Sequence, residues 1–492
     1  MLKTLKKKLD DYYKNDSDNP FFLGFICGFF SLVFYFSNNF FAINSLKHLT
    51  FIGSLFLGIP ILYFVLLQLF FKYNPKFLKY KKHVLFVSLI FCCAVLLTYV
   101  MFLIIKKKIL LCILIVSILL SLKLFREYKK VVVLIIVMTI IPMFKVFNHL
   151  IESMVNGQYN FNDIEILNTK LKKTPNIYLI QPDGYVAESM MKSNIYQHNS
   201  DLYDWLRKNE FKIYDRFRSN YPASLTSNSS MFLMKQHLFG KTLFPSIEMP
   251  NAREIICGDN PVKTILTNNN YKTHFIVQDD YFQQNYSEMK YDYSNISNNE
   301  IPMFTDGNKI KKVVFEDLLD VINKNTSSNF YFIEKLLPHH VHFSSPEDRV
   351  ETERKLYIKK IEEVNVWLKE TISYISEVDN EAIIIVLADH GGWVGMVDYN
   401  EMFQTQDKAK IESIFSTLAA IKWNGIDPKG YDLDLISNVN LFRVLFSVLS
   451  ENKQHLDHME DDSSYNIHVE NYFYNSVYQV INDKGEFVFI KK

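Results

Sequence analysis

Cysteine is scarce in this chain, and charge of either sign has almost no excess. The 492 residues contain five cysteines, and four of them fall in apolar stretches near the N-terminus. Only Cys257 lies in the more polar remainder, so that part has no internal disulfide and must be stable through its hydrophobic core. The net charge of +1 gives no strong electrostatic basis for binding nucleic acid.

Charged residues are almost absent from five long apolar stretches between residues 20 and 148. They run Phe21–Ala42, Leu49–Phe71, Val84–Ile105, Ile109–Leu124 and Val131–Phe147. Each approaches or exceeds the ~17–25 residues that a helix needs to cross a bilayer, and the fourth is the shortest. They also lack acidic residues, which argues against a transporter. We therefore predict a cytoplasmic arm at 1–19 and a transmembrane domain of five helices at 20–148.

The basic residues between these stretches predict the orientation of the chain in the membrane. The N-terminal arm, the second loop and the fourth loop carry five, five and four of them, against one and three in the first and third loops. The positive-inside rule then favours a cytoplasmic N-terminus, and five spans place everything after residue 148 outside. The first span is long and no small-residue cleavage pattern follows it, so we interpret it as an anchor.

The remainder of the chain alternates strand-like and helix-like segments. Strand-like runs lie at Asn176–Ile180, Phe211–Asp215, Thr273–Gln278, Asn329–Ile333 and Ala382–Ala388, and helical spacing occurs at 197–210 and 352–377. We interpret residues 149–173 as a polar linker. The alternation predicts an α/β extracytoplasmic domain over 174–492, with a mainly parallel sheet and helices on both faces. Functional sites in such sheets gather beyond the carboxyl ends of the strands.

The last strand-like run ends abruptly in Asp389-His390-Gly391-Gly392. The run is apolar and largely β-branched, which is typical of a strand buried on both faces. We expect the two glycines to let the backbone turn sharply after it. A carboxylate and an imidazole at this place can share one divalent metal. The alternative is an aspartate that caps a turn beside an incidental histidine.

Three further groups of polar residues stand at the ends of predicted elements. Asp183, in a Pro-Asp-Gly sequence, is either a simple turn residue or a metal carboxylate. The hydroxyl-rich segment 219–232 either caps a helix that begins near Ser227 or presents a hydroxyl at a helix N-terminus, where an anion such as a phosphoryl group is favoured. Three histidines lie within 339–342, and surface histidines are the alternative there. Together these groups fit oxygen-rich binding of Mn²⁺ or Zn²⁺.

The order of these groups resembles the sulfatase and alkaline phosphatase superfamily. Its pattern of a strand with Asp, a hydroxyl-led helix, Pro-His and Asp-His-Gly is matched by Asp183, Ser224, His339 and Asp389-His390. Five N-terminal spans resemble the bacterial membrane branch, which includes the phosphoethanolamine transferases and the phosphoglycerol transferases that build lipoteichoic acid. Two further segments, Asn220–Ser227 and Val439–Arg443, resemble a sulfatase-like membrane subgroup with an Asn-Tyr-x-x-Thr-x-x-Ser pattern.

The resemblance implies an alkaline phosphatase-like fold with a divalent metal ion, Mn or Zn, as its cofactor. Asp183, Ser224, Asp389 and His390 would bind the metal, and Ser224 would be the catalytic nucleophile. His339 would contact the substrate or the leaving group. Whether a second metal binds through the other two histidines of 339–342 stays open.

Two departures from the family pattern leave alternatives open. The subgroup usually has Thr where Ser224 stands, and Thr226 offers a rival register because it also has a hydroxyl three residues later. We favour Ser224 from its spacing to the Asn-Tyr pair. The lipoteichoic acid type shows Glu where this chain has Asp183, which weakens an assignment to that branch.

The expected function is transfer of a phospho-alcohol group, of phosphoethanolamine or phosphoglycerol type. The resemblance implies a phospholipid donor, a cell-envelope glycan or lipid acceptor, and a phospho-Ser intermediate. The enzyme would be a multi-pass protein of the bacterial cytoplasmic (inner) membrane, with an extracytoplasmic, periplasmic catalytic domain.

The sequence leaves two other classes of function open. One is a membrane-bound sulfatase-like hydrolase, either a phosphodiesterase or phosphatase or a sulfuric ester hydrolase. True sulfatases mature the nucleophile of a Cys/Ser-x-Pro-x-Arg motif, and after Ser224 the corresponding positions are Thr226 and Asn228. An unmodified hydroxyl that attacks phosphorus therefore fits better. The other class is a catalytically inactive envelope assembly protein.

Overall fold

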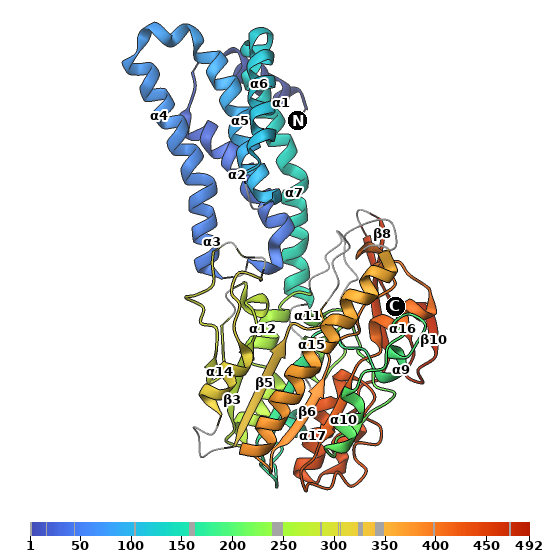
Figure 1. The fold of residues 1–492 in the computed structure, drawn as a ribbon. Coiled ribbons are helices and arrows are strands. Elements are labelled where there is room, and N and C mark those ends of the chain that lie inside the picture. Colours follow the sequence, from blue (N-terminus) through green and yellow to red (C-terminus); the bar gives the residue numbers. More distant parts are fainter. Residues whose placement is uncertain are drawn as a thin grey trace. The chain divides into compact units, whose positions relative to one another are not determined.

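The computed structural model of the chain divides it into two units (Figure 1). They are the N-terminal unit, Met1–Val155, and the C-terminal unit, Asn156–Lys492. The structure describes residues 2–15, 17–43, 45–102, 105–156, 163–238, 249–285, 288–303, 305, 307–322, 328–339, 349–396, 399–471 and 474–492. Of the clustered histidines, His340 and His342 lie outside these residues.

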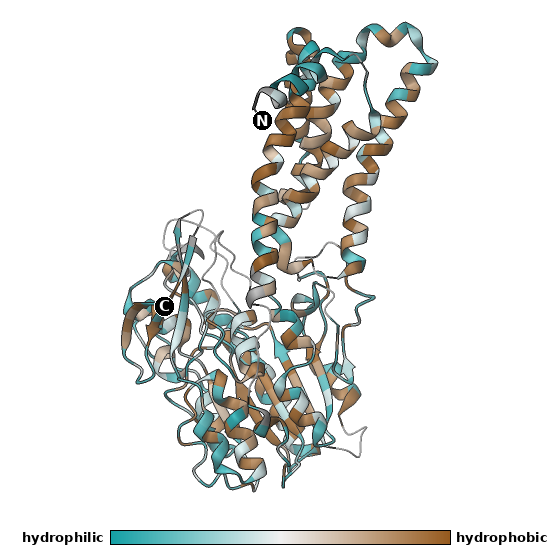
Figure 2. Ribbon diagram, turned by 180° about the vertical axis from the view of Figure 1, so that it is seen from behind, coloured by the Kyte–Doolittle hydropathy of each residue, from teal (hydrophilic) through white to brown (hydrophobic). Residues whose placement is uncertain are grey.

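The N-terminal unit consists of helices, most of them apolar along their length (Figure 2). They are α1 (Leu2–Lys14), α2 (Pro20–Asn39), η1 (Phe40–Ala42), α3 (Leu46–Gly53), η2 (Ser54–Gly58), α4 (Ile59–Tyr73), η3 (Pro75–Tyr80), α5 (Lys81–Phe102), α6 (Lys107–Leu124), η4 (Phe125–Glu127) and α7 (Tyr128–Asn156). Among the described residues, four segments are long and apolar enough to cross a membrane. The fourth, Lys107–Ile151, contains both α6 and α7, so the predicted number of five spans is not confirmed.

Polar contacts join three basic segments of the N-terminal unit to one another. Lys81, at the start of α5, pairs with Asp18 at 2.7 Å. Lys129, at the start of α7, donates a hydrogen bond to the carbonyl oxygen of Tyr12 at 3.0 Å. The segment before α2, the start of α5 and the start of α7 therefore meet at one end of the helix bundle.

Close helix packing holds the rest of the N-terminal unit together. A Cβ atom at Gly28 of α2 would lie 2.1 Å from the carbonyl oxygen of Phe56 in η2, so glycine lets the two backbones touch. Phe41, just after α2, packs its ring 5.2 Å from that of His149, near the end of α7. The carboxyl ends of α2 and α7 are therefore neighbours.

A seven-stranded sheet forms the centre of the C-terminal unit, in the order β2-β7-β6-β1-β5-β3-β4. Its strands are β1 (Ile177–Pro182), β2 (Lys212–Ile213), β3 (Lys272–Val277), β4 (Tyr293–Ser294), β5 (Asn329–Lys335), β6 (Ile383–Leu387) and β7 (Ala419–Lys422). The neighbours from β6 to β4 are parallel, whereas β7 is antiparallel to β6 and to β2. The predicted mainly parallel sheet is confirmed, and all five strand-like runs form strands in it.

Helices cover both faces of this sheet. They are α8 (Ile164–Leu167), α9 (Glu188–Met191), α10 (Leu202–Lys208), α11 (Ser224–Leu233), α12 (Ala252–Cys257), α13 (Pro261–Asn268), α14 (Val314–Val321), α15 (Arg349–Val378), α16 (Lys408–Phe415) and α17 (Leu441–Ser450), with 3-10 turns η5 (Tyr281–Gln283), η6 (Tyr399–Phe403), η7 (Asn438–Asn440) and η8 (Lys453–His458). On β1, Leu179 belongs to the core under α11 and α17, and Ile180 belongs to the core under α10 and α15. Successive residues of the strand thus feed two separate hydrophobic layers.

The carboxyl-terminal part of the chain adds structure that the sequence did not predict. Strands β8 (Ser464–Asn471), β9 (Tyr474–Ile481) and β10 (Phe487–Lys491) form a separate antiparallel sheet. The segment Val439–Arg443 spans the end of η7 and the start of α17. Arg443 is 3% exposed and its guanidinium pairs with the carboxylate of Asp163 at 2.7 Å, which fixes the start of the C-terminal unit to α17.

We expect Arg443→Ala to lower the free energy of unfolding of the C-terminal unit by about 1.5–3 kcal/mol, because it removes a buried guanidinium that is hydrogen-bonded to the half-buried Asp163 carboxylate. Lys263→Ala breaks a pair whose Asp259 side chain is 70% exposed, and it should cost less than about 1 kcal/mol. All four tryptophans lie in the C-terminal unit, so denaturant titration followed by tryptophan fluorescence measures this unit. Equal losses in the two variants would contradict a stabilising role for the buried pair.

Candidate metal and nucleophile site

The predicted metal carboxylates lie at the carboxyl edge of the sheet. Asp183 follows β1 and Asp389 follows β6, two strands that are parallel neighbours. Because carboxyl ends of adjacent parallel strands meet, residues that are far apart in the sequence become neighbours there. The backbone N–H of Gly184 donates to Asp389 Oδ1 at 3.2 Å and links the two strand ends directly.

Ser224 is the first residue of α11, and the preceding N-cap residue, Ala223, provides no side-chain cap. The amides of the first helical turn therefore have no intrahelical acceptor and point toward any anion placed there. The alternative interpretation, a polar loop that caps a helix, placed the start of the helix near Ser227. The helix in fact begins three residues earlier. Ser227 instead donates its hydroxyl to the backbone carbonyl of Asp389 at 2.6 Å, and Asn438 donates to the Ser227 hydroxyl at 3.1 Å. These bonds tie α11 to the end of β6.

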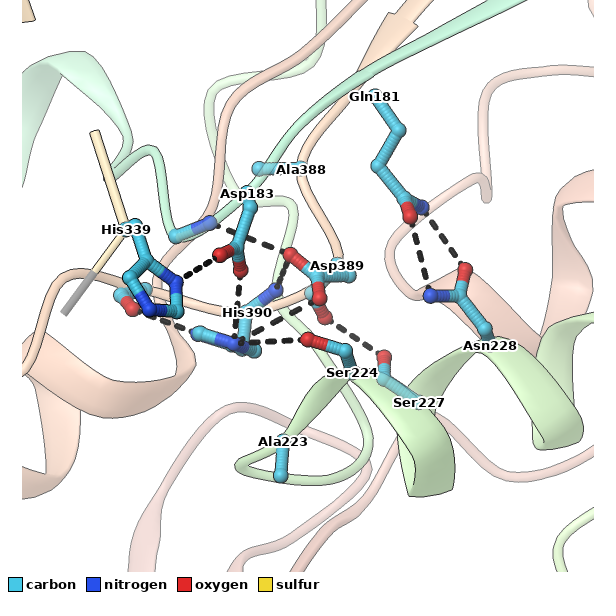
Figure 3. Close-up of polar contacts among 12 residues, drawn as sticks. Gln181, Asp183, Ala223, Ser224, Ser227, Asn228, His339, Ala388, Asp389 and His390 are labelled. Atoms are coloured by element: carbon cyan, nitrogen blue, oxygen red, sulfur yellow. Dashed lines mark hydrogen bonds and ion pairs between the residues drawn. The ribbon is translucent and has the colours of Figure 1, made fainter. Parts of the chain in front are cut away.

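Four side chains converge on one point at this edge (Figure 3). His390 Nε2 lies 3.2 Å from Asp183 Oδ1, 3.4 Å from Ser224 Oγ and 3.5 Å from Asp389 Oδ2. Ligands at about 2.0–2.2 Å from a tetrahedral metal ion are roughly 3.3–3.6 Å from one another. The observed spacing fits that arrangement.

The unsatisfied oxygens of this cluster also fit a cation. Asp183, Asp389 and His390 are all buried, and one ligand atom from each lies within 4.8 Å of the others. Asp183 Oδ1 and Asp389 Oδ2 make no hydrogen bond among the described residues beyond their ion pairs with His390 Nε2. Buried carboxylate oxygens without a partner are costly, and a shared divalent ion removes that cost.

Hydrogen bonds around His390 orient its ring toward the cluster. Its Nδ1–H donates to the carbonyl oxygen of Gly391 at 2.8 Å, which leaves Nε2 as the nitrogen that faces the oxygens. Asp389 Oδ1 accepts the backbone N–H of His390 at 3.0 Å in addition to that of Gly184. One oxygen of Asp389 is thus held by the backbone, and the other is left for the cation.

The electrostatics of the cluster depend on burial and on the neighbouring charges. Burial favours the neutral form of Asp183, but the imidazoles of His339 and His390 outweigh it and hold the pKa of this carboxyl well below its usual range. Burial raises the pKa of Asp389, against the opposing influence of His390. Burial disfavours the charged imidazole of His390, yet the carboxylates of Asp389 and Asp183 raise its pKa to about 9. In the metal-free protein, the His390 proton therefore supplies part of the missing positive charge.

His339 lies beside the cluster and reaches solvent. Its Nδ1 contacts Asp183 Oδ2, and its backbone N–H donates to the carbonyl oxygen of Asp183 at 2.9 Å. The side chain is 35% exposed, whereas that of Asp183 is only 1% exposed. This position beside Asp183 is compatible with the predicted contact to a substrate or leaving group.

Thr226, the rival nucleophile, uses its hydroxyl differently. Thr226 Oγ1 donates to the carbonyl oxygen of Ala223 at 2.9 Å, within its own helical turn. Ser224 Oγ instead lies within reach of His390 Nε2. The geometry therefore favours Ser224 over Thr226, as the spacing to the Asn-Tyr pair does.

The two glycines after His390 were expected to let the backbone turn sharply, and the chain does bend at Asp389 and His390. Neither has a positive φ, and it is Gly184, after Asp183, that has a φ of 73°. A Cβ atom at Gly391 would lie 2.1 Å from the carbonyl oxygen of Ser413, and one at Gly392 would lie 2.6 Å from the Tyr357 ring. These glycines therefore also permit close packing, a role that the sequence did not predict.

Several residues that hold the cluster in place were not predicted from the sequence. Gln181 and Asn228 exchange amide hydrogen bonds of 2.8 and 3.0 Å, which join β1 to α11. Tyr357 of α15 donates its hydroxyl to the carbonyl oxygen of Gly184 at 2.7 Å. Glu334 of β5 is buried, and burial together with nearby Asp279 and Asp183 raises its pKa well above its usual range. None of these residues belongs to a sequence motif with a fixed spacing. Their contacts are visible only in the structure, where α11 and α15 lie against the strands.

We expect the Mn²⁺ affinity of the full chain to rise about tenfold per pH unit between pH 6 and 8. The ion binds the neutral imidazole, and the raised pKa of His390 means that a proton must leave first. Calorimetric titration in two buffers of different ionisation enthalpy measures the affinity and the released proton together. His274→Gln, which changes a buried histidine bonded to Asn329 instead, should keep this slope. An affinity that does not change over this range would contradict the arrangement.

Three of the solved structures with a similar chain trace are each 15% identical to this chain or less. The C-terminal periplasmic domain of EcEptC from Escherichia coli is 12% identical, with a TM-score of 0.41, and covers 61% of this chain and 92% of its own. The integral membrane protein lipooligosaccharide phosphoethanolamine transferase A from Neisseria meningitidis is 12% identical, with a TM-score of 0.40 and coverage of 86% and 95%. The lipoteichoic acid synthase LtaP from Listeria monocytogenes is 15% identical, with a TM-score of 0.41 and coverage of 66% and 91%. At these scores the likenesses support no further argument.

Sequence comparison identifies the family directly. No curated protein matches the chain. The sequence model of the sulfatase family matches residues 175–450, which is more than half of the chain. This range contains all four residues of the cluster and His339. The chain belongs to the sulfatase family, and it is an enzyme of the sulfatase and alkaline phosphatase superfamily.

Proposed function

We propose that the chain transfers a phospho-alcohol group, of phosphoethanolamine or phosphoglycerol type, from a phospholipid to a cell-envelope glycan or lipid. The observation that carries this proposal is the position of Ser224. Its hydroxyl stands at the N-terminus of α11 and lies 3.4 Å from His390 Nε2, in a cluster with two buried carboxylates. The Ser224 hydroxyl, as the nucleophile, therefore lies where the helix N-terminus would bind a phosphoryl anion.

The cluster would hold one divalent cation, Mn²⁺ or Zn²⁺, through Asp183, Ser224, Asp389 and His390. When bound, the cation would lower the pKa of the Ser224 hydroxyl and neutralise charge on the phosphoryl oxygens. The His390 ring is oriented for this by Gly391, and Asp389 by the backbone of Gly184. The donor chemistry of two carboxylates, an imidazole and a hydroxyl suits either metal.

The proposed reaction has two displacements at phosphorus. Ser224 Oγ, after losing its proton to solvent, bonds to the phosphorus of the donor, the bond from phosphorus to the diacylglycerol oxygen breaks, and His339 gives that oxygen a proton. In the second step His339 takes the proton of the acceptor hydroxyl, whose oxygen bonds to phosphorus while the bond from phosphorus to Ser224 Oγ breaks. Ser224 Oγ then regains a proton from solvent. The free amides at the start of α11 stabilise the charge that develops on the phosphoryl oxygens in both steps.

Five spans and a cytoplasmic N-terminus complete the proposal, with the C-terminal unit outside a bacterial cytoplasmic membrane. Support comes from the contacts of Lys81 with Asp18 and of Lys129 with Tyr12, which join the N-terminal arm to the starts of α5 and α7. The N-terminal arm and the starts of α5 and α7 can lie on one side of a membrane only if an even number of spans separates each from the next. The two spans between the start of α5 and the start of α7 are then α5 and α6, so α6 and α7 are separate spans. The basic residues at this end favour the cytoplasmic side.

We expect Ser224→Ala to lower the release of diacylglycerol from a phospholipid donor by at least about a thousandfold, because it removes the nucleophile. Thr226→Val is the matched control and should keep activity within a few fold of the unchanged protein. Mass spectrometry of protein trapped with a slow donor should find the added mass on Ser224. Activity that survives in Ser224→Ala and is lost in Thr226→Val would assign the reaction to Thr226.

Transfer and hydrolysis are separated by omitting the acceptor. With labelled donor vesicles and no acceptor, a transferase should release about one equivalent of diacylglycerol per protein and retain the label on Ser224. Continuous release of free phospho-alcohol at full rate would show that water is the acceptor and that the protein is a hydrolase. Absence of both a bound divalent ion and diacylglycerol release would identify an inactive assembly protein.

A further inference from the structure

Trp393, three residues after His390, has a backbone conformation that bulky residues rarely adopt. Its φ is 60°, in the left-handed region. A side chain of this size is a genuine outlier there. Such a conformation persists only where the surrounding structure enforces it, and it occurs most often beside functional sites.

Hydrogen bonds enforce this conformation from both sides of Trp393. Before it, the backbone N–H of Gly391 donates to a carbonyl oxygen of α16 at 2.6 Å. After it, the backbone N–H of Val394 donates to the Tyr196 hydroxyl at 3.4 Å, and the Val394 carbonyl oxygen accepts from the Ser413 hydroxyl at 3.2 Å. The backbone at Trp393 therefore cannot relax without breaking one of these bonds.

The enforced backbone places the indole ring of Trp393 against the imidazole of His390. The centroids of the two rings are 5.5 Å apart, and their planes are inclined by 32°. This geometry lies within the range of offset aromatic pairs. Trp393 is 5% exposed and His390 has no exposed surface, so the contact between the rings is buried.

His390 needs a restraint of this kind, because its hydrogen bond holds the ring at one atom only. Nδ1–H donates to the carbonyl oxygen of Gly391 at 2.8 Å, and Nε2 faces the oxygens of Asp183 and Ser224 (Figure 3). A single bond at Nδ1 leaves the ring free to tilt about that atom, and a tilt moves Nε2 away from those oxygens. A flat aromatic ring packed against the imidazole restricts the tilt.

From the enforced backbone and the ring contact, we infer that Trp393 is a positioning residue that holds His390 Nε2 in place for the cation. This inference rests on the proposed metal site, but it requires no particular donor, acceptor or reaction. It also explains the backbone at Trp393. The fold keeps an unfavourable conformation there because that conformation brings an aromatic ring beside a metal ligand.

The test measures the Mn²⁺ affinity of the full chain in phosphatidylcholine nanodiscs by calorimetric titration. Trp393→Leu keeps an apolar side chain but loses the flat ring, and it should weaken Mn²⁺ binding about tenfold or more. Trp393→Phe retains a flat ring and should restore the affinity to within about threefold of the unchanged protein.

Trp423→Leu is the matched control for Trp393→Leu. Trp423 is also buried, at 8% exposed, but it follows the end of β7, at the opposite edge of the sheet from His390. Both variants lose a buried indole and should unfold at lower denaturant concentration, and only Trp393→Leu should lose Mn²⁺ affinity. A purely structural role would lower the stability and leave the affinity unchanged. Equal affinities in the two leucine variants would therefore overturn the inference.

The fluorescence of the same proteins tests the position of the indole directly. Co²⁺ quenches the emission of an indole that lies close to it. It should quench part of the emission of the unchanged protein and of Trp423→Phe, and most of this quenching should be lost in Trp393→Phe, which still binds the ion. Full quenching in Trp393→Phe would show that this indole does not lie beside the cation, and it would overturn the inference.

Two further outcomes separate this inference from the metal site on which it rests. Absence of Mn²⁺ binding by the unchanged protein would refute the proposed metal site and the inference with it. Normal binding by the unchanged protein and by Trp393→Leu would refute the inference alone. Trp393→Gly should also resist denaturant better than Trp393→Ala, because only glycine adopts a φ of 60° without strain. The reverse order would contradict the enforced backbone.

Discussion

Two carboxylates buried side by side, those of Asp183 and Asp389, are the constraint on which the rest of the site depends. Each has an oxygen that makes no hydrogen bond among the described residues beyond its ion pair with His390 Nε2. Buried anions in such proximity destabilise the fold by several kcal/mol unless a positive charge is shared between them. His390 supplies part of that charge when protonated, and a divalent ion supplies it fully. The need for a cation follows from burial and chemistry alone, before any relative of the chain is considered.

The scaffold places this cluster with little freedom. Parallel pairing of β1 and β6 brings the carboxylates together, and the close approach of Gly391 to Ser413 fixes the backbone after His390. The hydrogen bond from Ser227 to the Asp389 carbonyl then sets α11, so that Ser224 is aimed at the cluster by its helix. Ser224, the proposed nucleophile, is therefore positioned by the backbone.

The sequence predicted the parts of this arrangement that local patterns encode. Apolar β-branched runs predicted the strands, and the polar residues that follow two of these runs predicted Asp183 and Asp389 as site residues. The choice of Ser224 over Thr226 rested on spacing, and the structure adds that the Thr226 hydroxyl bonds to Ala223. The antiparallel β7 was missed because its short run carries no distinctive alternation. The close packing of Gly391 was missed because its approach to Ser413, 22 positions later, leaves no trace in the local sequence.

The most direct test of the central claim is anomalous diffraction from crystals of the full chain grown with Mn²⁺ or Zn²⁺. Data collected on both sides of the absorption edge of the metal locate the ion independently of any assumed chemistry. The account predicts an anomalous peak about 2.0–2.3 Å from Asp183 Oδ1, Asp389 Oδ2, His390 Nε2 and Ser224 Oγ. Full occupancy of another site, with no anomalous density between these four atoms, would contradict it.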